Sequence, residues 1–152
     1  MRLILQRVTS AEVRVAGEPI GRIGRGLLVL VGVEKGDGAK EAVGAARKLA
    51  HLRVFEDGQG RMNLAPGAAG AAFLVVSQFT LAGSLAHGRR PSFDGAAPPE
   101  AAEPLVERLV EELRRAGHSV ETGRFGARME VELVNDGPVT LLLELRAAPM
   151  RT

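Results

Sequence analysis

The chain has 152 residues and no cysteine, which excludes disulfides, thiolate zinc sites and a cysteine nucleophile. The lack of cysteine fits a reducing compartment, and we expect a cytoplasmic protein. No apolar run is long enough to span a bilayer, because the longest early one covers only residues 27–33. Arginines near the amino terminus argue against a signal peptide. We therefore expect a soluble protein without a membrane partner.

Aromatic residues are nearly absent: the chain has five Phe and neither Tyr nor Trp. This scarcity argues against a base-stacking sheet of the RRM kind. The basic residues are 17 Arg and only 3 Lys, so the pI is 9.7 although the net charge is +2. Arginine suits bidentate phosphate contacts. The abundance of Gly and Ala indicates a GC-rich genome as the more direct cause, so charge alone supports nucleic-acid binding weakly.

Conventional catalytic machinery is also missing. The histidines, His51, His87 and His118, are isolated and lack metal-ligand spacing, so we predict neither a metal nor a cofactor. The chain contains no GxSxG elbow and no HExxH helix. Its carboxylates fall mainly on predicted solvent faces. A conventional hydrolase is hard to build from this inventory.

Periodicity predicts a single α+β domain over residues 1–152, with two main helices against a mostly antiparallel sheet or partial barrel. One helix begins after Asp37, its expected N-cap, and ends near residue 52; the other begins at Pro98 or Pro99 and ends before Gly117. Residues 64–72 are expected to be a loop without chemistry. Residues 1–15 are expected to form one long strand, or two separated by a bend near residues 9–10. Further strands are expected over residues 20–23, 27–33, 53–56 and 73–79, near Val120, and over 129–133 and 139–145.

The last two of those strands flank the sequence Asn135-Asp136-Gly137-Pro138. Residues 129–133 alternate apolar and acidic side chains, whereas residues 139–145 are aliphatic enough for a more deeply buried strand. Pro138 fixes its own φ and restricts Gly137 before it. The segment is either a rigid turn at a strand start or a shaped pair of backbone carbonyls aimed at a ligand.

Ser77-Gln78-Phe79-Thr80 is the second unusual stretch, because it ends a buried strand with polar side chains and one aromatic ring. It could be a strand end that satisfies its own backbone. Alternatively, it is a cup of hydroxyl, amide and backbone N–H groups suited to a nucleoside or to the oxyanion of acyl transfer. The long polar connection over residues 82–98 follows it, and loops of that length are often functional.

These two stretches, in this order and spacing, closely resemble the D-aminoacyl-tRNA deacylases. The likeness extends over nearly the whole chain, including residues 6–8, 26–33, 90–93 and 122–125. The resemblance implies a homodimer with pockets at the interface and aminoacyl-tRNA as the partner. It implies that a cis Gly137-Pro138 bond, held with help from Arg7, enters the pocket of the other subunit as a chirality filter. There Ser77, Gln78, Phe79 and Thr80 would receive the terminal adenosine and its aminoacyl ester.

The implied reaction is hydrolysis of the ester that joins a D-amino acid to the 3′ end of tRNA, with L-aminoacyl-tRNA rejected. Neither motif holds a clear base for Thr80, with Asp136 as the one exception to consider. We favour water attack assisted by the ribose 2′-OH of the substrate, with backbone N–H groups near Phe79 and Thr80 holding the oxyanion. The alternatives are a Thr80 acyl-enzyme and a non-catalytic tRNA- or nucleotide-binding module. If the filter acts by exclusion, glycyl-tRNA should be cleaved as well.

Overall fold

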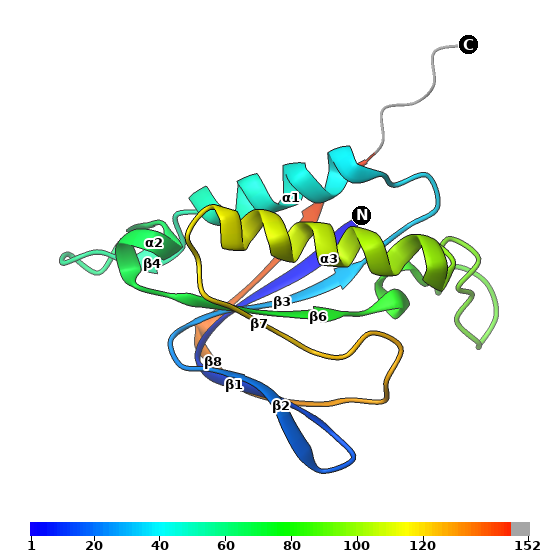
Figure 1. Ribbon diagram of the computed structural model, residues 1–152, viewed down its shortest axis with the longest axis horizontal. Helices are drawn as coiled ribbons and strands as arrows, with labels where there is room; N and C mark the ends of the chain where they lie inside the picture. Colours follow the sequence, from blue (N-terminus) through cyan, green and yellow to red (C-terminus); the bar gives the residue numbers. More distant parts are fainter. Residues whose placement is uncertain (147–152) are drawn as a thin grey trace.

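A six-stranded sheet forms the centre of the computed structural model, which describes residues 1–146. Residues 147–152 of the expected domain lie outside the described residues. The strands follow the order β2-β1-β3-β6-β7, and β8 pairs with the other edge of β1 (Figure 1). The strands of this sheet are β1 (Arg2–Val15), β2 (Glu18–Ile23), β3 (Gly26–Gly32), β6 (Ala72–Ser77), β7 (Val120–Thr122) and β8 (Glu130–Glu144).

The sheet is mostly antiparallel, as expected, and it also holds two parallel pairs that the sequence did not predict. Strand β1 is antiparallel to β2, β3 and β8, whereas β3 with β6 and β6 with β7 are parallel pairs. The parallel pairs arise because a long helix follows β3 and another follows β6, and each returns the chain to the end where the strand began. The expected single-domain α+β class is confirmed, with a sheet that curls toward a barrel.

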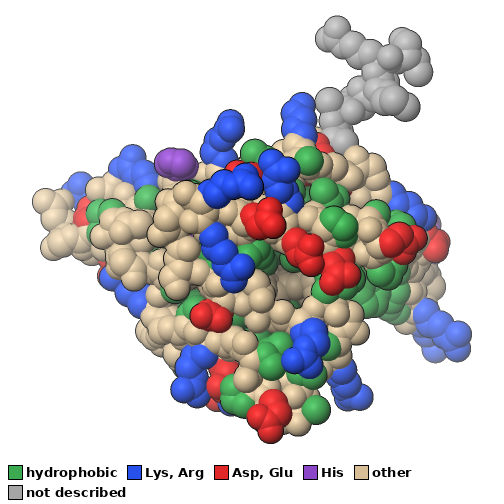
Figure 2. Space-filling view, in the orientation of Figure 1, with side chains coloured by type: hydrophobic (Ala, Val, Ile, Leu, Met, Phe, Trp, Pro, Cys, Tyr) green, Lys and Arg blue, Asp and Glu red, His purple; other side chains and the backbone are tan. Residues whose placement is uncertain are grey.

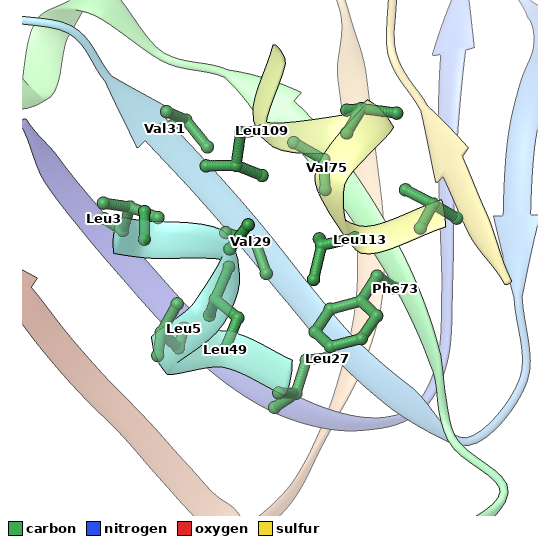
Figure 3. Packing of buried hydrophobic residues seen from close by; sticks show 14 of the residues in the cluster. Leu3, Leu5, Leu27, Val29, Val31, Leu49, Phe73, Val75, Leu109 and Leu113 are labelled. Atoms are coloured by element: carbon green, nitrogen blue, oxygen red, sulfur yellow. The ribbon is translucent and has the colours of Figure 1, made fainter. Parts of the chain in front are cut away.

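Two long helices, α1 (Ala39–His51) and α3 (Pro99–Arg115), lie side by side over one face of the sheet (Figure 1). Figure 3 shows side chains of both helices, such as Leu49 and Leu109, meeting those of the strands, such as Val29 and Phe73. These four residues are fully buried, so they form the main core. Gly117, with φ +91°, follows α3, as its predicted stop.

A smaller core lies on the opposite face, where Val8, Val13, Leu28 and Leu74 pack together. Side chains of Met129, Val131 and Leu133 cover this cluster from the start of β8, which pairs with the second half of β1. The curl of the sheet thus gives both faces of β3 and β6 a hydrophobic cover. Among residues 1–146, no helix is long and apolar enough to cross a membrane.

The helix signals need two corrections. The N-cap of α1 is Gly38, not Asp37, and the Glu41 carboxylate accepts the Gly38 N–H at 2.8 Å. Asp37 instead binds the terminal ammonium of Met1, at 2.8 Å, and the Glu34 N–H, at 2.7 Å. The segment predicted as a loop holds a short helix, α2 (Pro66–Ala69), with proline in its first turn and Gly70 in the left-handed conformation at its end.

Three strand predictions also change. The strands expected over residues 129–133 and 139–145 form one continuous strand, β8 (Glu130–Glu144). The part predicted to be deeply buried exposes 60% of Leu142. This part lies at the sheet edge, so Leu141 and Leu142 are exposed, whereas Leu143 and Leu145 pack against the main core. Strand β6 ends at Ser77 rather than Phe79, and a 3-10 helix, η1 (Phe79–Ala82), follows it. The strand expected over residues 53–56 shrinks to β4 (Phe55–Glu56), which pairs with β5 (Met62–Leu64) in a separate sheet.

Candidate active site

A cavity of about 620 Å³ opens at the carboxyl ends of β3 and β6, beside the first turns of α3. Its wall is apolar apart from Ser77 and Gln78, and it includes three of the five phenylalanines of the chain. Concentration of a scarce residue type at one place marks the cavity as the principal site. The lining residues that the argument uses are Ser77, Gln78, Phe79, Phe93, Phe125 and Met129.

The lip of the cavity is a pair of phenylalanine rings. Phe79 and Phe93 meet edge to face with their centroids 5.2 Å apart, and Phe79 is 59% exposed. The turn into η1 directs Phe79 away from the core that the preceding strand residues enter. Gly83 lets Phe93 approach, because a Cβ at Gly83 would lie 2.9 Å from the Phe93 ring. Two exposed aromatic faces beside an apolar hollow suit a nucleobase.

The polar groups of the lip come from Gln78 and from η1. The Gln78 side-chain amide donates to the Thr80 hydroxyl, which is solvent-exposed. The 3-10 hydrogen bonds begin with the Leu81 N–H, which donates to the Gln78 carbonyl at 3.2 Å. The helix therefore leaves the N–H groups of Phe79 and Thr80 without an intrahelical acceptor. These two amides are the donors available to an anionic oxygen at the lip.

No residue that lines the cavity is titratable. The Gln78 amide that touches Thr80 cannot take a proton from it, so that contact does not activate the hydroxyl as a nucleophile. The histidines lie elsewhere: His118 packs edge-on against Phe73, and burial, with a smaller contribution from nearby His51, lowers its pKa. Among residues 1–146, no three His, Asp or Glu side chains converge to hold a metal ion.

Gly137 and Pro138 lie within β8, where its pairing with β1 shifts register opposite residues 6–10. The peptide bond between them is cis, and Gly137 has φ +130°. A Cβ on Gly137 would lie 2.8 Å from a Val139 methyl carbon and 3.2 Å from an Arg7 nitrogen, so the position requires glycine. The Asn135 side-chain oxygen accepts a hydrogen bond from the Val139 N–H at 2.9 Å, which joins the residues on the two sides of Gly137-Pro138.

Arg7 is buried, at 4% exposed, and contacts the segment that precedes Gly137. Its guanidinium donates to the Val54 carbonyl at 2.7 Å and to the Asp136 carbonyl at 3.1 Å. The Asp136 carboxylate lies 3.4 Å from the same guanidinium, so Asp136 is committed to this ion pair. Arg7 therefore contacts the residue that precedes Gly137 and Pro138. Asp136 does not line the cavity of its own chain.

The two motifs do not meet within one chain. Ser77, Gln78 and Phe79 line the cavity and Thr80 follows them, whereas Gly137 and Pro138 do not line it. Strands β1 and β3 separate β8 from β6 in the sheet. The sequence prediction missed Phe93, Phe125 and Met129 as site residues. The scarcity of phenylalanine was the signal that could have singled out the first two.

Comparisons with known proteins agree with this geometry. The profile described as D-Tyr-tRNA(Tyr) deacylase matches residues 4–144. Proteins named D-aminoacyl-tRNA deacylase from Anaeromyxobacter dehalogenans and Heliobacterium modesticaldum are 59% and 55% identical over 146 residues, 96% of this chain and 98% and 97% of theirs. A solved structure described as c-Myc DNA Unwinding Element Binding Protein superposes with a TM-score of 0.91 at 42% identity, over 97% of this chain and 100% of that one. A probable eukaryotic D-amino acid tRNA deacylase, at 19% identity and TM-score 0.81 over 95% of this chain and 98% of that one, shares the fold.

The chain folds into a single α+β domain, and its relatives place it among enzymes of the hydrolase class. The chain belongs to the D-Tyr-tRNA(Tyr) deacylase family, since the match covers nearly its whole length at high identity.

Proposed function

We propose that this protein hydrolyses the ester of D-aminoacyl-tRNA, releasing the D-amino acid and tRNA, and that it does so as a homodimer. One observation carries the proposal: the aromatic cavity beside Ser77–Phe79 lacks the Gly137-Pro138 segment of its own chain. A second copy can supply that segment. The site is then complete only in the dimer, with Phe79 and its neighbours from one chain and Gly137-Pro138 from the other.

The exposed edge of β8 supports the dimer. This 15-residue strand pairs only with β1 among residues 1–146, so its other edge presents unpaired backbone groups. It also exposes 56% of Val134, 38% of Leu141 and 60% of Leu142. Apolar residues along a long open edge mark an interaction surface. Because Gly137-Pro138 lies in the middle of that strand, covering the edge would place the segment at the interface.

The Gly137 and Pro138 carbonyls would act as the chirality filter by crowding the space into which an L-side chain projects. This filter excludes the L-enantiomer by steric conflict and requires no favourable contact with the side chain of the D-enantiomer. Glycine has only hydrogens on its α-carbon, so the filter has nothing to reject. We therefore infer that glycyl-tRNA is cleaved as well, while L-alanyl-tRNA is spared.

The chemistry would come from the substrate and the main chain, because no titratable side chain lines the cavity. The oxygen of a water molecule attacks the ester carbonyl, with the ribose 2′-OH of the terminal adenosine assisting proton transfer. The N–H groups of Phe79 and Thr80 stabilise the developing oxyanion. The bond between the acyl carbon and the 3′ oxygen then breaks, and the 3′ oxygen leaves protonated as a hydroxyl group. Holding the ester against these groups supplies much of the rate enhancement.

Two rival functions use the same cavity. In a Thr80 acyl-enzyme, the hydroxyl attacks the ester and a covalent acyl-threonine forms. In a non-catalytic module, the pocket binds the tRNA end and releases nothing. Quenched reactions analysed by mass spectrometry would detect acyl-threonine, and release of the amino acid separates both enzymes from the binding module.

The experiment is deacylation of D-tyrosyl- and L-tyrosyl-tRNA, and of D-alanyl-, glycyl- and L-alanyl-tRNA, at matched enzyme concentration. We expect rapid release from both D-substrates and from glycyl-tRNA, and little from either L-substrate. Equal resistance of glycyl- and L-alanyl-tRNA would mean that the pocket grips a D-side chain, which contradicts the exclusion filter alone. Failure to release any D-amino acid would contradict the proposed function.

A further inference from the structure

The two loops that supply aromatic rings to the cavity also carry arginines. Residues 83–95 hold Arg89 and Arg90 before Phe93, and residues 123–129 hold Arg124 and Arg128 around Phe125. All four arginines are exposed. Each loop thus combines a ring at the cavity with two cations outside it.

None of these four arginines lies within ion-pair distance of a carboxylate among residues 1–146. This separates them from the arginines that do form ion pairs in that part of the chain, namely Arg2, Arg7, Arg14, Arg22, Arg108, Arg115 and Arg146. A solvent-accessible guanidinium without a carboxylate partner keeps its full set of donors for a phosphate. We call these four arginines the rim of the cavity. They lie on the loops beside it and have no carboxylate partner among residues 1–146.

The first loop is held in a fixed relation to the cavity. The backbones of Ser84 and Ser92 bond to each other in both directions, at 2.7 and 2.9 Å, and close its base. Phe93 then packs on Phe79, which joins the loop to the lip. Arg89 and Arg90 lie in the loop between Ser84 and Ser92. These backbone hydrogen bonds and the Phe93 contact therefore fix the position of their backbone relative to the lip.

The second loop turns its apolar side chains inward. Phe125, Ala127 and Met129 line the cavity, whereas Arg124 and Arg128 do not. A turn closed by the Ala127 N–H and the Arg124 carbonyl, at 3.2 Å, fixes this arrangement. The arginines therefore belong to the outer side of the loop, away from the residues that line the cavity.

The charge on α3 restricts the side from which an anionic chain can approach. Figure 2 shows acidic side chains gathered over α3, with Lys and Arg side chains around this acidic group. The exposed acids of the helix are Glu100, Glu103, Glu107 and Glu111. A polyanion is repelled from this face and attracted to the arginine-bearing loops. Charge thus selects the loops as the approach to the cavity.

We propose that Arg89, Arg90, Arg124 and Arg128 bind phosphates of the tRNA acceptor end next to the terminal nucleoside, and so position the ester in the cavity. The partner is the sugar-phosphate chain, not the bases, because guanidinium groups around a rim read phosphate without reading sequence. This inference rests on the proposed function for its substrate. It adds the surface that holds the tRNA outside the cavity.

The test compares two double variants, R89A/R90A and R124A/R128A, with the control R47A/R61A. The control removes two exposed arginines that also lack an ion pair among residues 1–146 but belong to neither loop. The ligand is an acceptor-stem minihelix that carries no amino acid and ends in a single-stranded 3′ tail. Its binding is measured by fluorescence anisotropy across a salt series.

We expect each rim variant to bind about tenfold more weakly than the control. The slope of log K against log salt should become shallower by about 0.7 for each single-strand phosphate that the variant no longer neutralises. With D-tyrosyl-tRNA, KM should rise while kcat changes little.

The outcomes separate this inference from the proposed function. Weaker minihelix binding and a shallower slope support the rim even if no amino acid is released, in which case the proposed function alone fails. If affinity and slope equal those of the control, the proposed phosphate binding by these arginines is wrong, whatever the deacylation result. Sedimentation of each variant is measured as well. A rim variant that becomes monomeric would show that its arginines bind carboxylates of the second copy, which also overturns the proposal.

Discussion

Thr80 lies where a nucleophile could act, but no base among residues 1–146 of its own chain contacts its hydroxyl. Its hydroxyl lies at the lip of the cavity, yet its neighbour is the Gln78 amide, which donates a hydrogen bond and takes no proton. No titratable group lines the cavity to replace that amide. The residue is therefore placed to shape the lip and to present its backbone N–H.

Replacement of Thr80 by Val should therefore preserve most of the activity, with kcat for D-tyrosyl-tRNA within about tenfold of wild type. The shape of the side chain is retained and the backbone N–H is unchanged. Single-turnover deacylation measures this directly. A loss on the order of 10⁴-fold or more is typical of deleting a true nucleophile and would favour the acyl-enzyme.

His118 gives the second prediction at this scale, because burial and nearby His51 lower its pKa from the ordinary value of 6.5. The unfolded chain then binds the proton more tightly than the folded one. Stability therefore falls as pH drops from about 6.5 toward the folded pKa, and it levels off below that value. His118→Asn should reduce this fall in stability, measured as the difference between urea midpoints at pH 7.5 and 5.5.

His87→Asn is the matched control, since His87 is exposed in the polar loop. It should leave the acid-induced drop as large as in wild type. An equal drop in both variants would mean that other groups set the acid sensitivity.

At the scale of elements, the contact between β3 and β6 depends on a small residue. Gly26 pairs with Ala72 at the start of this parallel ladder. A Cβ on Gly26 would lie 2.0 Å from the Ala72 carbonyl oxygen, a backbone atom that cannot turn aside. The pairing brings together the two strands whose carboxyl ends build the cavity, so the glycine acts on the site from the far end of the sheet.

Gly26→Ala should lower the free energy of unfolding by about 3 kcal/mol or more, at the upper end of overpacking effects. Gly24→Ala is the matched control, because a Cβ at Gly24 meets nothing within 4 Å. Urea denaturation of both variants at neutral pH measures the difference. Equal stability of the two would show that the ladder can shift to accept the methyl group.

At the scale of the whole molecule, the proposed dimer links the site to the open edge of β8. If a second copy covers that edge, a charge within it should separate the subunits. Leu142→Glu places a carboxylate at a position that is 60% exposed in one chain. We expect monomers at micromolar concentration and loss of deacylation, because burying an unpaired charge is costly. Sedimentation velocity and deacylation are measured together.

Met62→Glu provides the control, since Met62 is 58% exposed but lies on β5, away from the main sheet. This variant should stay dimeric and active. A Leu142→Glu monomer with full activity would contradict a site shared between two chains.

The sequence by itself determined the elements that local chemistry dictates. Apolar periodicity predicted α1 and α3 closely, and the prolines and Gly117 marked the bounds of α3, because such signals act within a few residues. The two unusual motifs were found in the same way, since their composition departs from that of an ordinary strand end or turn. Membership of the family followed from the same residues.

Only the tertiary structure decided where these pieces meet. Asp37 does not cap its helix, because it binds the terminal ammonium, 36 residues away in the chain. The aliphatic residues after Gly137 lie at an exposed edge, because burial depends on which layer covers a strand and not on its own sequence. The uncommitted arginines beside Phe93 and Phe125 became visible for the same reason. An ion pair, or its absence, is a property of neighbours in space, and the order of residues along the chain does not fix those neighbours.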